Sequence, residues 1–121
     1  MIKKTIKYTD YNGVERVEDF YFNLSKAEIT EMELSVDGGM AAMLETIIKS
    51  NNNKEIVSMF KEIILKAYGE KSEDGKRFIK SKELTEGFAQ TEAFSELFVE
   101  LALNEEKAAE FVNGIIPGGL Q

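Results

Sequence analysis

Three glutamates, Glu92, Glu96 and Glu100, recur at four-residue intervals in the second half of the chain. On a helix this spacing aligns the three carboxylates along one face, where they could meet a cation or the basic residues of a partner. A calcium ion requires about six to eight oxygen ligands, and one helical face supplies few that converge. The pattern therefore favours a solvated acidic face over a metal site, with a basic partner as the alternative.

A second acidic group, Glu73-Asp74, is followed directly by Gly75. The ligand spacing of a calcium-binding loop is missing here, and Asp-Gly is common in ordinary turns. We therefore predict a turn at this point and no cation site.

The side chains that most often perform catalysis are missing, because the chain has no histidine and no cysteine. Their absence removes the usual general base at neutral pH and the thiol nucleophile, and excludes most zinc sites and nearly all common catalytic triads. The glycine patterns of phosphate-binding loops and a Ser-x-x-Lys motif are also absent. We predict a protein that is not an enzyme and has no cofactor.

The charge balance is acidic, with 22 Asp and Glu against 15 Lys and Arg and a net charge of −7. Nucleic-acid binding depends on Lys and Arg, so the charge argues against it, although an acidic mimic of DNA would share this balance. No apolar run approaches the ~20 residues of a membrane span, and the basic start lacks the apolar stretch of a secretion signal. We expect a protein of the cytoplasm that binds neither nucleic acid nor membrane.

Methionine is concentrated in the centre of the chain, within segments of helical periodicity. A single methionine most often fills a core, but surfaces rich in methionine accept varied apolar partners. We predict that part of this apolar stripe is exposed and binds a partner or a second copy of the chain. The candidate partner-binding residues are Met40, Met43, Ile47, Met59 and Phe60.

The N-terminus has the pattern of a β-hairpin. Ile2, Ile6 and Tyr8 alternate with polar residues, and Asn12-Gly13 is a strong turn signal before a second strand over 15–23.

Two registers fit this hairpin. A two-residue loop sets Ile6 opposite Asp19, whereas a longer loop with a bulge sets Ile6 opposite Phe20 and Ile2 opposite Leu24. We prefer the longer loop because it pairs apolar side chains across the strands.

Helix start signals follow. Ser25 and Glu28 form a capping box, flanked by Leu24 and Ile29 as a hydrophobic staple, and the first helix is expected to end near Val36 before Asp37-Gly38-Gly39. Apolar stripes predict further helices over 40–48, 56–67 (capped by Asn52 and ended at Gly69), 81–88, 92–101 and 105–116, with Ser81, Thr91 and Asn104 as caps and Pro117 as a stop.

These elements predict a mainly α (α+β) fold, in which an N-terminal β-hairpin precedes a bundle of four to six short helices. We expect one domain over residues 1–121, made of the hairpin (1–24), the helical bundle (25–116) and a flexible tail (117–121).

Four segments resemble the tail assembly chaperones of long-tailed (siphovirus-type) bacteriophages of Gram-positive bacteria. They are KYTDYNGVERVEDFYFNLSKAEITEMELS (7–35), ILKAYGEKSEDGKRFIKS (64–81), FAQTEAFSELFVELA (88–102) and AAEFVNGIIP (108–117). None of them is a catalytic signature, and the resemblance offers no catalytic residues to transfer.

The resemblance implies a non-enzymatic chaperone that coats the phage tape measure protein, keeps its apolar helices soluble and recruits major tail tube subunits. Such a chaperone would act in the host cytoplasm and be absent from the finished virion. The methionine-bearing stripes would then contact the tape measure protein or mediate self-association. The alternatives are a tail completion or terminator protein that stays in the virion, and a small acidic inhibitor of a host protein.

Overall fold

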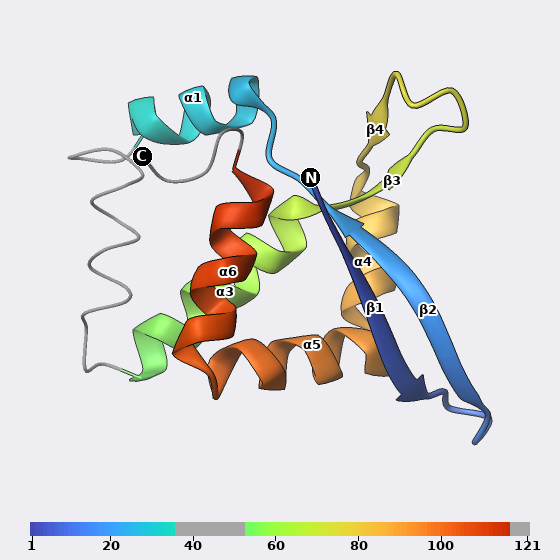
Figure 1. The fold of residues 1–121 in the computed structure, drawn as a ribbon. Helices are drawn as coiled ribbons and strands as arrows, with labels where there is room; N and C mark the ends of the chain where they lie inside the picture. The colour runs from blue at the N-terminus through green and yellow to red at the C-terminus, as the bar shows by residue number, and fades with distance from the viewer. Residues whose placement is uncertain (36–52, 117–121) are drawn as a thin grey trace.

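The computed structural model describes residues 1–35 and 53–116. In chain order its elements are β1 (Ile2–Thr9), β2 (Glu15–Phe22), α1 (Lys26–Ser35), α3 (Asn53–Ala67), β3 (Tyr68–Lys71), β4 (Phe78–Ile79), α4 (Lys82–Ala89), α5 (Glu92–Ala102) and α6 (Glu105–Ile115). The predicted N-terminal hairpin is present, as are the predicted helices that fall within these two ranges, which gives an α+β fold (Figure 1). The helix predicted over 40–48 lies outside the described residues. The strands follow the order β1-β2-β3-β4, and β3 and β4 were not predicted.

The predicted register of the first hairpin is wrong. Ile6 pairs with Glu18 and Ile2 with Phe22, so neither Phe20 nor Asp19 lies opposite Ile6. The actual register differs from the preferred one by two residues, and a shift of two returns each side chain to the same face of the strand. Ile2, Ile6 and Tyr8 therefore share one face of the strand as predicted, although their cross-strand partners differ from the predicted ones.

The loop explains the error in register. The Asp10 N–H donates to the Val14 carbonyl at 2.9 Å, and the Gly13 N–H donates to the Asp10 carbonyl at 3.0 Å. Three residues thus form the loop, and Gly13 has a φ of +80°, in the left-handed region that glycine adopts without steric cost. The loop is centred on Asn12 rather than on the Asn12–Gly13 bond.

The helix α3 ends at Ala67, the last residue of the predicted apolar stripe, but Gly69 does not cap it. The Ala67 carbonyl accepts the Asn23 N–H at 2.8 Å, and the next two residues, Tyr68 and Gly69, pair with the end of β2. The prediction of Gly69 as a helix cap is therefore wrong, because pairing with β2 takes over where the helix ends.

The charged segment after Gly69 is a second hairpin rather than a plain connector. Glu70 pairs with Ile79 and Lys71 with Phe78, so the segment begins as strand. The predicted turn at 73–75 is confirmed, since the Gly75 N–H donates to the Ser72 carbonyl at 3.0 Å.

The predicted N-caps of helices within the described residues are confirmed. The Ser25 N–H donates to the Glu28 carboxylate at 2.9 Å and the Glu28 N–H to the Ser25 hydroxyl at 3.1 Å, which is the predicted capping box. The side chains of Ser81, Thr91 and Asn104 each accept a backbone N–H from the first turn of α4, α5 and α6. These short side chains satisfy donors that the helix itself leaves unpaired.

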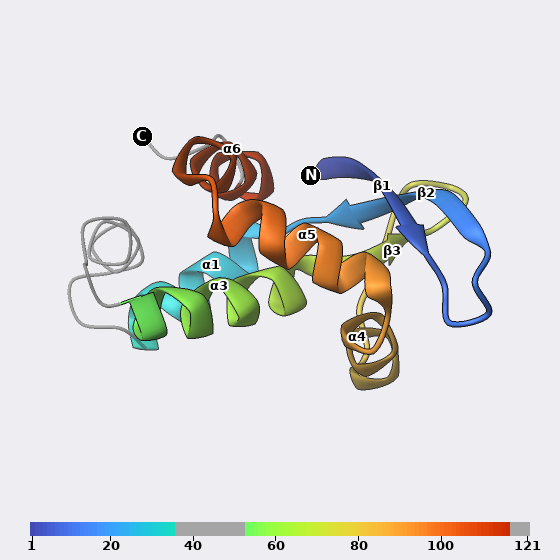
Figure 2. The same ribbon diagram turned by 90° about the horizontal axis from the view of Figure 1, so that it is seen from below.

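One apolar core joins the hairpin to the helices. In Figure 2, α5 lies between α3 and β1, and both contact it. Tyr68 and Phe88 stack with ring centroids 4.2 Å apart, and Phe22 meets Phe88 and Phe111 edge to face. The fully buried large side chains come from the end of β2 and from α3, α5 and α6: Phe22, Leu24, Ile64, Leu97, Leu101, Phe111, Val112 and Ile115.

Candidate functional site

Within residues 1–35 and 53–116, no group of three or more Asp or Glu side chains is placed to hold a metal ion. Among the helices in these ranges, none has the length and apolar character needed to cross a membrane.

The predicted partner-binding residues fall in different places. Met40, Met43 and Ile47 lie outside the described residues, and Met59 belongs to α3. Phe60 is 6% exposed and forms part of the core, so it presents almost no surface to a partner. Partner binding through the methionine-bearing stripes stays a prediction.

The acidic face of α5 is only partly solvated. Glu92 accepts a hydrogen bond from the Tyr11 hydroxyl at 2.8 Å, which ties the hairpin loop to the start of the helix. Glu100 accepts from the Lys107 ammonium at 2.9 Å and lies 3.8 Å from that of Lys4. The Lys107 hydrogen bond lowers the pKa of Glu100 below its ordinary value. Of the three aligned carboxylates, only Glu96 is exposed, so most of this face serves internal contacts.

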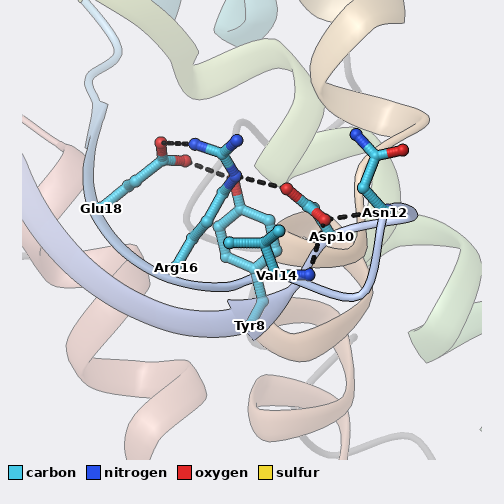
Figure 3. Close-up of polar contacts among 6 residues, drawn as sticks. All are labelled: Tyr8, Asp10, Asn12, Val14, Arg16 and Glu18. Atoms are coloured by element: carbon cyan, nitrogen blue, oxygen red, sulfur yellow. Dashed lines mark hydrogen bonds and ion pairs between the residues drawn. The ribbon is translucent and has the colours of Figure 1, made fainter.

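The tip of the first hairpin is fixed by a single carboxylate, that of Asp10 (Figure 3). It accepts the backbone N–H groups of Asn12 at 2.9 Å and Val14 at 3.0 Å, and the Arg16 guanidinium at 2.6 Å. The Arg16 hydrogen bond, followed by that from the Val14 N–H, holds the pKa of Asp10 below its ordinary value. The loop backbone is thereby held in one conformation.

The same network continues onto β2 through Glu18. The Glu18 carboxylate lies 3.7 Å from a terminal guanidinium nitrogen of Arg16 and accepts a hydrogen bond from the Tyr8 hydroxyl (Figure 3). This hydrogen bond raises the pKa of Tyr8. The contacts brace β1 against β2 near the loop end of the hairpin.

A cleft opens where β2 and β3 separate. The two strands pair only at Tyr21–Gly69 and Phe22–Tyr68, and Figure 1 shows the β1–β2 and β3–β4 hairpins pointing away from each other beyond that contact. The cleft has a volume of about 410 Å³ and is lined by Glu18, Asp19, Phe20, Tyr21, Tyr68, Gly69, Glu70 and Lys71. The lining thus combines three carboxylates, one ammonium and three aromatic side chains from neighbouring strands.

Sequence reasoning missed this cleft because it did not assign β3 and β4. A signal was present: the turn at 73–75 is flanked by Tyr68 on one side and by Phe78-Ile79 on the other, as in a short hairpin.

The described residues form a small α+β fold. Comparison with protein families identifies the class of protein. The sequence model of a family described as phage tail assembly chaperone matches residues 1–121, the whole chain. The chain therefore belongs to the phage tail assembly chaperone family. No curated protein and no solved structure matches it.

Proposed function

We propose that this protein binds the tape measure protein of its phage in the host cytoplasm and helps to recruit tail tube subunits to it. It leaves before the tail is complete and is absent from the virion. The match of the chaperone family to the full length of the chain carries this proposal. The acidic, histidine- and cysteine-free composition suits a protein that acts by binding.

The methionine-bearing stripes are the proposed contact with the tape measure protein. Methionine adapts to varied apolar side chains, which suits a chaperone that covers a long series of different helical segments. Met40, Met43, Ile47 and Met59 form this proposed surface. Phe60 belongs to the core and is not part of this surface.

Co-purification with a tagged tape measure protein tests the proposal. We expect the wild-type chain to co-purify with the tape measure protein, and the tube protein to join that complex when added. Met40→Glu and Met43→Glu should reduce recovery without loss of helical circular dichroism. Val99→Glu, at a half-exposed position on α5, is the matched control and should not reduce it.

Two results would contradict the proposed surface or the proposed function. If Met40→Glu and Met43→Glu unfold the protein, these residues belong to the core and the proposed surface is wrong. If the wild-type chain never co-purifies with the tape measure protein, the proposed function is wrong.

Mass spectrometry of purified virions separates a chaperone from a tail completion protein. We expect no peptides of this chain in mature particles. Its presence at a fixed copy number per tail would support the structural alternative. Specific recovery of one host protein from an uninfected lysate would instead support the inhibitor reading.

A further inference from the structure

One edge of β2 has no neighbouring strand over most of its length. The Asn23 N–H points toward α3 and β3, since it donates to the Ala67 carbonyl at 2.8 Å. Backbone groups of a strand alternate in direction with a period of two, so those of Val17 and Asp19 point to the same side. In the part of the chain that the structure describes, β3 pairs only with the last two residues of β2. The outward N–H and C=O groups of Val17 and Asp19 therefore meet no strand.

This open edge is accessible and rigid. Val17 is 64% exposed, and Glu15, Arg16 and Asp19 are exposed beside it. On its other side β2 is paired with β1 along its full length, and the Asp10–Arg16–Glu18 network fixes the loop. A strand held in its extended form loses little conformational freedom when another strand adds to it.

The charged side chains that line the cleft favour a basic ligand. The cleft contains Glu18, Asp19 and Glu70 against Lys71. Glu18 is shared with Arg16, whose guanidinium lies 3.7 Å from its carboxylate. Asp19 and Glu70 against Lys71 then leave a net negative charge of one.

We propose that the outer edge of β2 and the adjoining cleft bind an extended, lysine- or arginine-rich segment of a partner protein. The segment adds to the sheet as a strand beside Val17 and Asp19, and its backbone pairs with their outward groups. Its basic side chains meet Glu18, Asp19 and Glu70, and apolar side chains between them reach Phe20 and Tyr68. This site goes beyond the proposed function and does not depend on which protein supplies the segment.

A second copy of the chain fits the site poorly. An acidic β2 edge facing another acidic β2 edge would bring like charges opposite each other. If a second copy paired its β1 with this edge, the β1 strands of the two copies would lie two strand spacings apart, about 10 Å. A helix with its side chains is at least that wide. Each copy carries α5 against β1, so these helix layers would collide. A flexible segment avoids both conflicts.

Peptide titration followed by NMR tests the site directly. The probe is a blocked octapeptide of alternating lysine and valine, and the matched control has glutamate in place of lysine. We expect the basic peptide alone to shift the amide resonances of Val17 and Asp19 and to slow their hydrogen exchange. Equal binding of the acidic peptide, or an unchanged exchange rate at both amides, would overturn the proposal.

Matched charge reversals locate the site on the surface. Glu70 lines the cleft, and Glu73 is an exposed glutamate three residues away in the turn. Glu70→Lys should weaken binding of the basic peptide by about three- to tenfold, whereas Glu73→Lys should leave it nearly unchanged. Equal weakening by both variants would show attraction to net charge alone and contradict the site.

A backbone variant tests strand addition. Val17→Pro removes an outward N–H, which an edge strand tolerates, and Val17→Ala keeps it. With both variants folded by circular dichroism, the proline variant should lose peptide binding and the alanine variant should keep it. If Val17→Pro unfolds the protein, the same peptide with alternate amides N-methylated replaces it and should fail to bind. Retained binding in either case would overturn pairing through the backbone.

Discussion

The ammonium of Lys80 lies 2.7 Å from a carboxylate oxygen of Glu28 and joins two parts of the chain 52 positions apart. It also donates to the Asn23 carbonyl at 2.7 Å. The other oxygen of Glu28 accepts the Ser25 N–H of the capping box. One carboxylate thus caps α1 and ties it to the residue that follows β4.

Loss of this tether should destabilise the protein. The side chains of Lys80 and Glu28 are only 23% and 28% exposed, so Lys80→Met leaves a partly buried carboxylate and a carbonyl without their donor. We expect the free energy of unfolding, measured by urea denaturation, to fall by about 1–2 kcal/mol.

Lys82→Met is the matched control, because Lys82 pairs with Glu86 at 3.8 Å while both side chains are mostly exposed, at 88% and 62%. Surface pairs of this kind contribute little, so the control should show no measurable change. Equal losses in the two variants would argue against the tether.

The pH dependence of stability should depend on Glu28. Burial raises the pKa of this carboxyl, but the hydrogen bonds from Lys80 and Ser25 outweigh burial and bring the pKa below its ordinary value of 4.5. The folded state therefore binds a proton less readily than the unfolded state. The resulting stability is present above about pH 4.5 and is lost as pH falls through the folded pKa.

The measurement is the urea midpoint from pH 7 down to pH 3. The midpoint of Glu28→Gln should fall less steeply over this range than that of the wild type, while Glu96→Gln, at an exposed position, should follow the wild type. Superimposable curves for Glu28→Gln and the wild type would refute the assignment.

Gly69 should tolerate no larger residue. A Cβ placed there would lie 2.6 Å from a ring carbon of Phe78 and 2.7 Å from the Ile79 carbonyl oxygen, so the backbone of β4 must move. We expect Gly69→Ala to lower the free energy of unfolding by about 1–3 kcal/mol.

A second glycine provides the opposite expectation. Gly87 is exposed in α4 and a Cβ there meets nothing within 4 Å. Gly87→Ala should therefore stabilise the protein by up to about 1 kcal/mol, because alanine favours the helix. A neutral Gly69→Ala would show that β3 and β4 are not packed as described.

The hairpin loop should depend on the oxygens of Asp10 more than on its charge. Asp10→Ala removes the acceptor for two loop N–H groups, so hydrogen exchange at Asn12 and Val14 should speed up. Asp10→Asn keeps one acceptor oxygen and should preserve most of the protection while weakening the contact to Arg16. Identical exchange in the two variants would show that the charge matters more than the hydrogen bonds.

Sequence predicted the helix starts well and the strand pairing poorly. Ser25, Ser81, Thr91 and Asn104 each bond to a neighbour three residues away, so the signal is local. The register of a hairpin depends on how its loop closes. Asn12-Gly13 alone suggested a two-residue loop or a longer loop with a bulge, whereas the Asp10 side chain fixes a three-residue loop centred on Asn12.

The second hairpin and the open edge needed the tertiary structure. Tyr68–Lys71 is too short to be predicted as a strand from its sequence. The strand forms because the end of β2 lies beside it directly after α3 and pairs with it. The contact between Lys80 and Glu28 likewise cannot be predicted from sequence spacing, because the two residues are 52 positions apart. The open edge of β2 becomes visible only once β3 is seen to pair with its last two residues.

The central claim is that this chain keeps a tape measure protein soluble. The direct measurement is the soluble fraction of the tape measure protein when it is co-expressed with increasing amounts of this chain. We predict that the fraction rises with the amount of chaperone and that the soluble tape measure protein elutes as a complex with it. A tape measure protein that stays insoluble at every ratio, beside a folded and abundant chaperone, would contradict the account.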